Sequence, residues 1–169
     1  MSVKVFFFIT FFSFTTTAYC QGESKPMILN SRQTNTIEQL LAPYKGHPVF
    51  IDLWASWCAP CKEEFKFAPA LYKELGKRNI KMLYISIDKD PADSVWKKDI
   101  QDFKLYGYHI KANKSLRDEL TTFIWGGIDA FSIPNYLLFD KDGHILSKHM
   151  PRPENMQELC KEIDEKIRN

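Results

Sequence analysis

Two cysteines three positions apart are the residues of this sequence best suited to chemistry. Cys58 and Cys61 lie in the stretch FIDLWASWCAPCKEE, in which an apolar run reaches two tryptophans before the pair and charged residues follow it. A pair with this spacing can bind a metal, form a structural disulfide or act as a reactive dithiol. The residues around the pair distinguish these three kinds of site.

Metal and haem binding fit the pair poorly. A structural zinc site needs about four ligands, commonly two cysteine pairs, but the sequence has no second pair with this spacing. Haem attachment requires a histidine directly after the second cysteine, where the sequence has Lys62. We therefore expect no metal and no cofactor. A copper carrier that binds through Cys58, Cys61 and a histidine such as His144 is the alternative, because thiolates suit Cu(I).

A reactive dithiol agrees best with the neighbouring residues. A structural disulfide that closes so short a loop removes little chain entropy and stabilises weakly. Pro60 fits the first turn of a helix, where no N–H is needed, so Cys58 would lie where backbone N–H groups and the helix dipole favour a thiolate. Cys61 would then be within reach of a mixed disulfide at Cys58. Trp57, Ala59 and Pro60 flank the sulfurs and are candidates for contact with a substrate.

The elements that must position the pair alternate between strand and helix. Residues 48–54 are almost continuously apolar and predict a buried central strand, and residues 59–77 predict an amphipathic helix with a kink at Pro69. The helical patterns also place Val95 and Cys160 on inward faces. Further strands are predicted at 27–29, 80–87, 106–110, 136–139 and 144–148, and further helices at 36–41, 93–103, 114–124 and 154–167. This order predicts a three-layer α/β sandwich with the dithiol at the C-terminal end of the central strand.

The first twenty residues have the three-part layout of a secretory signal. Lys4 comes first, an apolar run follows at 5–14, and small and polar residues lead to Cys20. We expect cleavage after Cys20, which makes residues 1–20 a signal peptide and residues 21–169 one domain. Lipid modification of Cys20 is the alternative. Anchoring to a membrane is expected only if the leader is retained or Cys20 carries a lipid.

Composition and charge exclude several other classes of protein. A chain of 169 residues is the size of one domain with one core. Hydrophobic residues make up 44% and charged residues 26%, as in ordinary globular proteins. The formal net charge of +2 is much smaller than the positive charge that is typical of nucleic-acid-binding proteins. We therefore expect no nucleic-acid partner.

Two segments resemble parts of known proteins. VFIDLWASWCAPCK resembles the active-site segment of thioredoxins, and FSIPNYLLFDKDGHI resembles their cis-proline loop with the hairpin that follows. With the leader and the extra helix and strand before that loop, the chain is similar over roughly residues 27–167 to exported TlpA/ResA-type thiol-disulfide oxidoreductases of the bacterial envelope. The resemblance implies a thioredoxin-like sandwich: a central mixed sheet with helices on both faces and a helix–strand insertion before the cis-proline loop.

The resemblance also implies roles for individual residues. Cys58 is expected to be the exposed nucleophile and Cys61 the buried resolving thiol. Ile133 and Pro134 are expected to form a cis peptide whose Ile133 backbone pairs with an extended substrate. Asp52 matches the buried aspartate of thioredoxins and is expected to exchange a proton with Cys61, with a pKa raised by burial. A purely structural carboxylate at Asp52 is the alternative.

Three positions depart from the pattern of these relatives. Lys66 stands where thioredoxins have a proline that kinks the active-site helix, and Pro69 follows three residues later. Lys89 lies where the relatives often carry an acidic group, and Asn135 replaces the threonine that commonly follows the cis-proline. The first departure predicts a shifted kink, and the other two residues receive no role from the sequence.

The function that the resemblance implies is reduction of disulfides in other envelope proteins, which would be the substrates. Ala59 and Pro60 lack the histidine that strongly oxidising relatives carry between their cysteines. Because the compartment is oxidising, a membrane thiol that donates electrons is an expected partner. We expect the protein in the periplasm or cell envelope of a bacterium. A thiol peroxidase on the same fold is the other alternative, although its Pro-x-x-x-Thr-x-x-Cys motif is absent.

Overall fold

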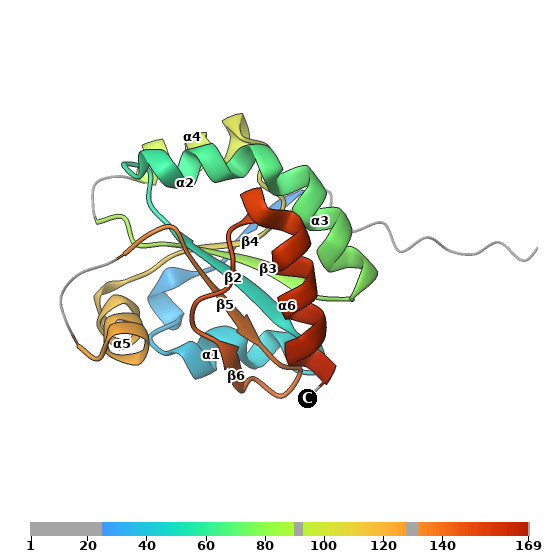
Figure 1. Cartoon of the computed structure of the whole chain (residues 1–169). Coiled ribbons are helices and arrows are strands. Elements are labelled where there is room, and N and C mark those ends of the chain that lie inside the picture. Colours follow the sequence, from blue (N-terminus) through green and yellow to red (C-terminus); the bar gives the residue numbers. More distant parts are fainter. Residues whose placement is uncertain (1–24, 90–92, 128–131, 169) are drawn as a thin grey trace, which may run out of the picture.

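A central sheet with helices on both faces forms the core of the computed structural model (Figure 1). The structure describes residues 25–89, 93–127 and 132–168. The predicted signal peptide at 1–20, with Cys20, lies outside these residues, so its processing stays a prediction. Of the helices in the described part of the chain, none has the length and apolar character needed to cross a membrane.

The sheet has six strands in the order β1-β4-β3-β2-β5-β6. Strands β1, β4, β3 and β2 are parallel to one another, whereas β5 is antiparallel to β2 and β6 is antiparallel to β5. The predicted mixed sheet is therefore confirmed. The strands are β1 (Pro26–Ile28), β2 (Val49–Trp54), β3 (Lys81–Ser86), β4 (Gly107–Lys111), β5 (Asn135–Phe139) and β6 (Ile145–Ser147).

The helices divide between the two faces of the sheet, as Figure 1 shows. Helices α2, α3, α4 and α6 cover one face and α1 and α5 cover the other, which confirms the three predicted layers. The helices are α1 (Ile37–Leu41), α2 (Ala59–Glu64), α3 (Ala68–Lys77), α4 (Asp93–Asp102), α5 (Lys114–Trp125) and α6 (Met156–Arg168).

Strand β2 is buried along its whole length because both faces of the sheet are covered. Successive side chains of a strand point to opposite faces. Phe50 and Trp54 therefore join the core under α2 and α3, whereas Ile51 and Leu53 join the core under α1 and α5. Each apolar side chain buried in this way contributes about 1.5–3 kcal/mol. The continuous apolar run that predicted a central strand follows from this double burial.

The long helix predicted at 59–77 is divided in two. Helix α2 ends at Glu64, a 3-10 turn spans Phe65–Phe67, and α3 begins at Ala68. Pro69 has no N–H to donate to the carbonyl of Phe65, and its ring would clash with that carbonyl in a continuous α-helix. The kink expected at Pro69 is thus confirmed, and it lies in the turn before the proline.

Two inward positions predicted from helical spacing are wrong. Val95 is 49% exposed, because α4 turns Trp96 and Ile100 inward and Val95 lies about 100° around the helix from Trp96. Cys160 is only half-buried, because Leu159 and Ile163 define the inward line of α6. Its Sγ lies 3.8 Å from Glu74 Oε2 on α3, at the edge of that packed face.

Replacing Gly107 with alanine should destabilise the sheet. Gly107 begins β4 with φ at +108°, and a Cβ there would lie 2.8 Å from the carbonyl oxygen of Met82 on β3. We expect Gly107→Ala to lower the free energy of unfolding by about 1–3 kcal/mol in urea denaturation. Gly76→Ala is the control, because Gly76 is helical with no neighbour near a new Cβ, and it should stabilise by about 0.5–1 kcal/mol. Equal midpoints for the two variants would contradict this account.

Candidate active site

The cysteine pair lies where strand β2 passes into helix α2. Cys58 is the N-cap of the helix, and its backbone N–H donates to the carbonyl of Ala55 at 3.0 Å. The N–H of Cys61 donates to the Sγ of Cys58 at 3.2 Å, and Pro60 occupies the first turn. The predicted position, at the C-terminal end of the central strand and the positive end of a helix dipole, is confirmed.

The two sulfurs form a disulfide in this structure, with an S–S distance of 2.05 Å and a Cα–Cα distance of 5.3 Å. Both cysteines are buried, Cys58 at 3% and Cys61 at 1% exposure. The expected exposure of Cys58 is therefore wrong for this oxidised state, because the bond to Cys61 holds its sulfur against the helix start, within the apolar cluster that includes Trp54. Trp57, at 65% exposure, presents the largest apolar surface beside the pair.

The other residues expected to contact a substrate are Ala59, Pro60 and Ile133. Ala59 and Pro60 are exposed in the first turn of α2. The bond between Ile133 and Pro134 is cis, as expected. Strand β5 begins at the next residue, which pairs with Leu53 near the end of β2, so this loop lies at the dithiol end of the sheet. Ile133 is half-buried. The substrate contacts themselves stay a prediction.

Asn135, whose role the sequence left open, ties the cis-proline loop to the segment after β6. Its side-chain NH₂ donates to the carbonyl of Lys148 at 3.0 Å, and its Oδ1 lies 2.8 Å from Nδ1 of His149. Because Oδ1 can only accept, Nδ1 of His149 must be the donor of that hydrogen bond. The first residue of β5 is therefore held by two hydrogen bonds from its own side chain.

Asp52 lies in the middle of a buried polar row that crosses the sheet. In the strand register it is the partner of Tyr84 on β3 and of Tyr136 on β5, and Tyr84 is the partner of His109 on β4. Registered partners point to the same face of a sheet, and these four side chains are at most 3% exposed. The row lies on the face that α2 and α3 cover, because Tyr84 and Tyr136 belong to the same cluster as both cysteines.

Burial raises the pKa of Asp52 well above its usual range, and the nearby charge of Glu64 adds to the effect. Asp52 Oδ1 has no hydrogen-bond partner among the described residues. Glu64 is 4% exposed and accepts the backbone N–H of Glu154 at 3.1 Å, and burial raises its pKa as well. The expected burial and raised pKa of Asp52 are confirmed, whereas its exchange of protons with Cys61 stays a prediction.

The rest of the polar row is joined to α3 by hydroxyl groups. The hydroxyls of Tyr84 and Tyr72 lie 2.7 Å apart, and the N–H of Tyr106 donates to the Tyr72 hydroxyl at 2.9 Å. His109 stacks on Tyr84 with ring centroids 4.8 Å apart. Burial lowers the pKa of His109 to about 4, so its imidazole is neutral at pH 7. Sequence analysis did not predict this row. The polar residues within the otherwise apolar strands were the feature that could have indicated it.

Asp88 is a second residue that sequence analysis passed over. It is fully buried, and its carboxylate accepts from the backbone N–H of Ser56 at 2.9 Å and from the Ser56 hydroxyl at 2.8 Å. The hydroxyl of Ser86 donates to the same carboxylate at 2.7 Å. Hydrogen bonds to a charged acceptor are strong. Asp88 thus anchors the loop that carries Trp57 and Cys58 to the end of β3.

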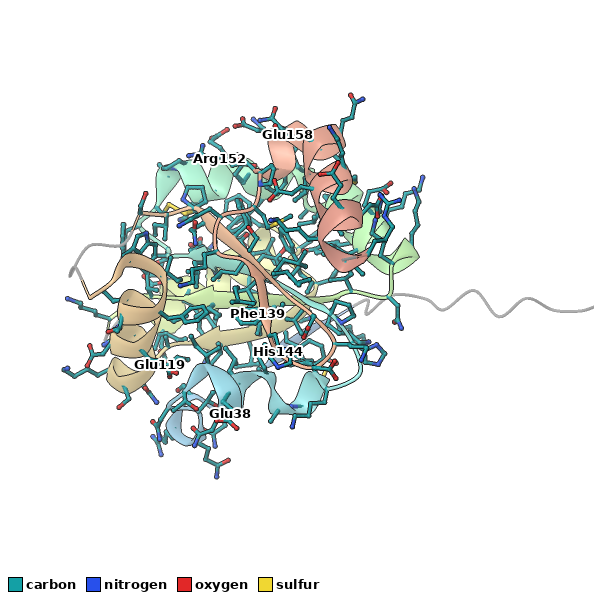
Figure 2. The ribbon with its side chains drawn as sticks, turned by 60° about the horizontal axis from the view of Figure 1, so that its bottom comes forward. Glu38, Glu119, Phe139, His144, Arg152 and Glu158 are labelled. Carbon is teal, nitrogen blue, oxygen red and sulfur yellow. A yellow bond between two sulfur atoms is a disulfide. The ribbon has the colours of Figure 1, made fainter. Side chains whose placement is uncertain are left out.

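The alternative copper site is not assembled in the described part of the chain. Asp140, Asp142 and His144 are the potential metal ligands that lie together there, within 4.8 Å of one another. They belong to the turn after Phe139, and Figure 2 shows His144 beside that end of β5. The dithiol is at the other end of β5, since Asn135 pairs with Leu53. His144 therefore cannot complete a site with the cysteines.

Comparisons with known proteins agree with this geometry. The Redoxin family model matches residues 14–161. The thiol-disulfide oxidoreductase ResA of Bacillus thuringiensis subsp. konkukian is 26% identical over 125 residues, which cover 73% of this chain and 67% of that protein. The crystal structure of a proposed thiol-disulfide oxidoreductase from Bacteroides vulgatus has a TM-score of 0.57 and 30% identity, covering 75% of this chain and 83% of that chain.

A more distant structure supports the fold alone. The thioredoxin domain of a thiol-disulfide oxidoreductase from Bacteroides vulgatus matches with a TM-score of 0.59 at 21% identity, over 74% of this chain and 82% of that chain.

The raised pKa of Asp52 predicts how stability depends on pH. Because the pKa is higher in the folded protein than in the unfolded chain, where it is ~3.9, folding favours the protonated carboxyl. This contribution to stability is fully present below the unfolded pKa and is lost as the pH rises through the folded pKa. Asp52→Asn should therefore raise the free energy of unfolding at pH 7 and change it little near pH 3, as urea denaturation at both values can measure.

The same variant tests the proposed proton transfer. General-base catalysis commonly contributes about 10²-fold or more, so Asp52→Asn should slow release of a mixed disulfide by about 10²-fold. Glu63→Gln is the matched control, because the Glu63 side chain is 77% exposed, and neither measurement should change with it. A stabilised variant with normal release across pH 6 to 9 would leave Asp52 with a structural role only.

Proposed function

The chain belongs to the Redoxin family, and from this premise we propose that it is an exported thiol-disulfide oxidoreductase that reduces disulfides of other bacterial envelope proteins. The observation that carries the oxidoreductase function is the Cys58–Cys61 disulfide at the start of α2. The cis-proline loop at the same end of the sheet supports it, as do the relatives described as thiol-disulfide oxidoreductases. The proposal adds three points to this function: the reductive direction, the substrates and the location of the protein.

The reaction begins with the reduced dithiol. The Cys58 thiolate attacks one sulfur of a substrate disulfide, forming a mixed disulfide and releasing the first substrate thiolate. The Cys61 thiolate then attacks the Cys58 sulfur, which releases the second substrate thiolate and leaves the Cys58–Cys61 disulfide. The substrate gains two electrons and the protein loses two. The state described by the structure is the product of this cycle.

The surrounding residues have separate tasks in these two steps. The N–H of Cys61 points to the Cys58 sulfur, and the helix start favours a negative charge there. Asp52 accepts the Cys61 proton for the second step, directly or through water, and its raised pKa suits exchange nearer neutral pH. Asp88 keeps the loop before Cys58 in place through Ser56.

Export and a supply of electrons belong together in this proposal. The leader-like pattern at 1–20 supports export. Outside the cytosol the disulfide would accumulate unless a reductant restores the dithiol. A membrane protein with a reactive thiol pair supplies the two electrons by the reverse exchange, and a soluble envelope protein with a disulfide consumes them.

Trapping of the mixed disulfide tests the substrates and the location together. Cys61→Ser, expressed with its leader in a bacterium, should form complexes with envelope proteins that disappear on reduction, because no resolving thiol remains. The measurement is a non-reducing gel of the envelope and cytosolic fractions. Cys58→Ser is the control and should trap none. Complexes formed by Cys58→Ser, or partners found only in the cytosol, would contradict the proposal.

The reduction potential tests the direction of the reaction. Ala59 and Pro60 add no charge or hydrogen-bond donor from their side chains to stabilise the Cys58 thiolate. A less stable reduced form is a better reductant, so we expect a potential nearer to thioredoxin's, about −270 mV, than to that of the strong oxidant DsbA, about −120 mV. Ala59→His should raise the potential. A native reduction potential near that of DsbA, about −120 mV, would instead indicate an oxidant.

A further inference from the structure

A wide groove runs from Trp57 toward helix α5. Its volume is about 1030 Å³, and its lining includes Trp57, Lys89, Lys114, Arg117, Thr122 and Gly127, which we call the Trp57 groove. Figure 1 shows α5 and the start of α2 on the same side of the molecule. The groove is lined by residues of α5 and by Trp57, just before α2. Because Trp57 directly precedes Cys58 and is 65% exposed, a polypeptide whose disulfide reaches Cys58 passes this groove.

Three cations, Lys89, Lys114 and Arg117, line the groove together with two carboxylates, Asp88 and Asp118, so its formal charge is positive. Lys89 is exposed, and Arg117 is half-buried with its Nη1 donating to the carbonyl of Ala112 at 2.5 Å. Neither cation forms a salt bridge with a carboxylate of the described residues, whereas Lys114 pairs with Asp118 at 2.6 Å. Two cationic side chains of the groove are therefore left to interact with a partner.

The other polar side chains of the groove already have hydrogen-bond partners within the chain. The Asp88 carboxylate accepts three hydrogen bonds from Ser56 and Ser86. The hydroxyls of Thr121 and Thr122 donate to carbonyls of their own helix. Helix α5 also begins at the groove, and its dipole adds positive potential near Lys114 and Arg117.

We propose that the Trp57 groove selects disulfide substrates that carry acidic residues beside the reactive cysteine. The inference deepens the proposed function and rests on it. Carboxylates of the substrate interact with Lys89, Lys114 and Arg117, while apolar parts of the same segment pack on Trp57. Charge complementarity of this kind raises the rate of encounter and discriminates against partners of like charge.

Three synthetic peptides with one disulfide each test the inference. They are identical except that the residues flanking one cysteine are glutamate, glutamine or lysine. We expect the reduced protein to react about three- to tenfold faster with the glutamate peptide than with the glutamine peptide at low salt, and slowest with the lysine peptide. The preference should disappear in about 0.5 M salt, which screens exposed charges.

Charge reversal in the groove provides the matched variant. Lys89→Glu with Lys114→Glu alters two exposed side chains and leaves Arg117 in contact with its carbonyl group. This variant should lose the preference for the glutamate peptide over the glutamine peptide, and its relative rate with the lysine peptide should rise. Lys73→Glu is the control, because Lys73 is exposed on α3 and does not line the groove; it should behave as the native protein does.

Two outcomes would overturn the inference: equal native rates with the glutamate and glutamine peptides, or an equal effect of Lys73→Glu. Binding of a cysteine-free glutamate peptide to the oxidised protein separates this inference from the redox function. If no peptide is reduced but the glutamate peptide binds and the groove variant weakens that binding, the proposed reductase is wrong and the acidic selectivity of the groove stands. If peptides are reduced without regard to charge, only the groove proposal fails.

Discussion

The burial of strand β2 on both faces is the constraint on which the rest of the structure depends. Its six residues lie between β3 and β5, so its C-terminal end is fixed in the middle of the sheet. Helix α2 starts just beyond that end and brings Cys58 to a helix N-terminus. Because β5 runs antiparallel to β2, it places the cis peptide before Asn135 at the same end. The dithiol and the cis-proline peptide therefore lie at the same end of the sheet.

The same double burial explains why the pKa of Asp52 is raised. A charge buried without a partner costs several kcal/mol, and a carboxyl in that position binds a proton instead. Its neighbours in the register, Tyr84 and Tyr136, are neutral groups that do not compensate a negative charge as a lysine would. Asp88 shows the opposite solution, because three hydrogen bonds satisfy its buried carboxylate. The two buried aspartates thus differ in their partners: Asp52 Oδ1 has none among the described residues, whereas Asp88 holds a loop.

Local sequence patterns predicted the features that depend on neighbours in the chain. Three such features are the apolar strand β2, the helix start at Pro60 and the helix break before Pro69. Each follows from residues that are close together in the sequence. The polar residues of the row through Asp52 are visible in the sequence, but their assembly into a row was not predicted, because it depends on the register between strands that are far apart in sequence. The prediction that Cys58 is exposed was wrong for a related reason, since its exposure depends on the bond to Cys61 and on the packing around both sulfurs.

The burial of both sulfurs in the oxidised form separates recognition from chemistry. In the proposed cycle, the oxidised protein is the form that meets an electron donor, whereas the reduced protein meets the substrate. The exposed groups near the pair in the oxidised form are Trp57 and the first turn of α2, which a donor in that cycle would contact first. If both partners approach through this one surface, they compete for it, and the protein must release one before it binds the other. Competition of this kind suits a carrier of electrons, because it prevents direct exchange between donor and substrate while each still reaches the same sulfur.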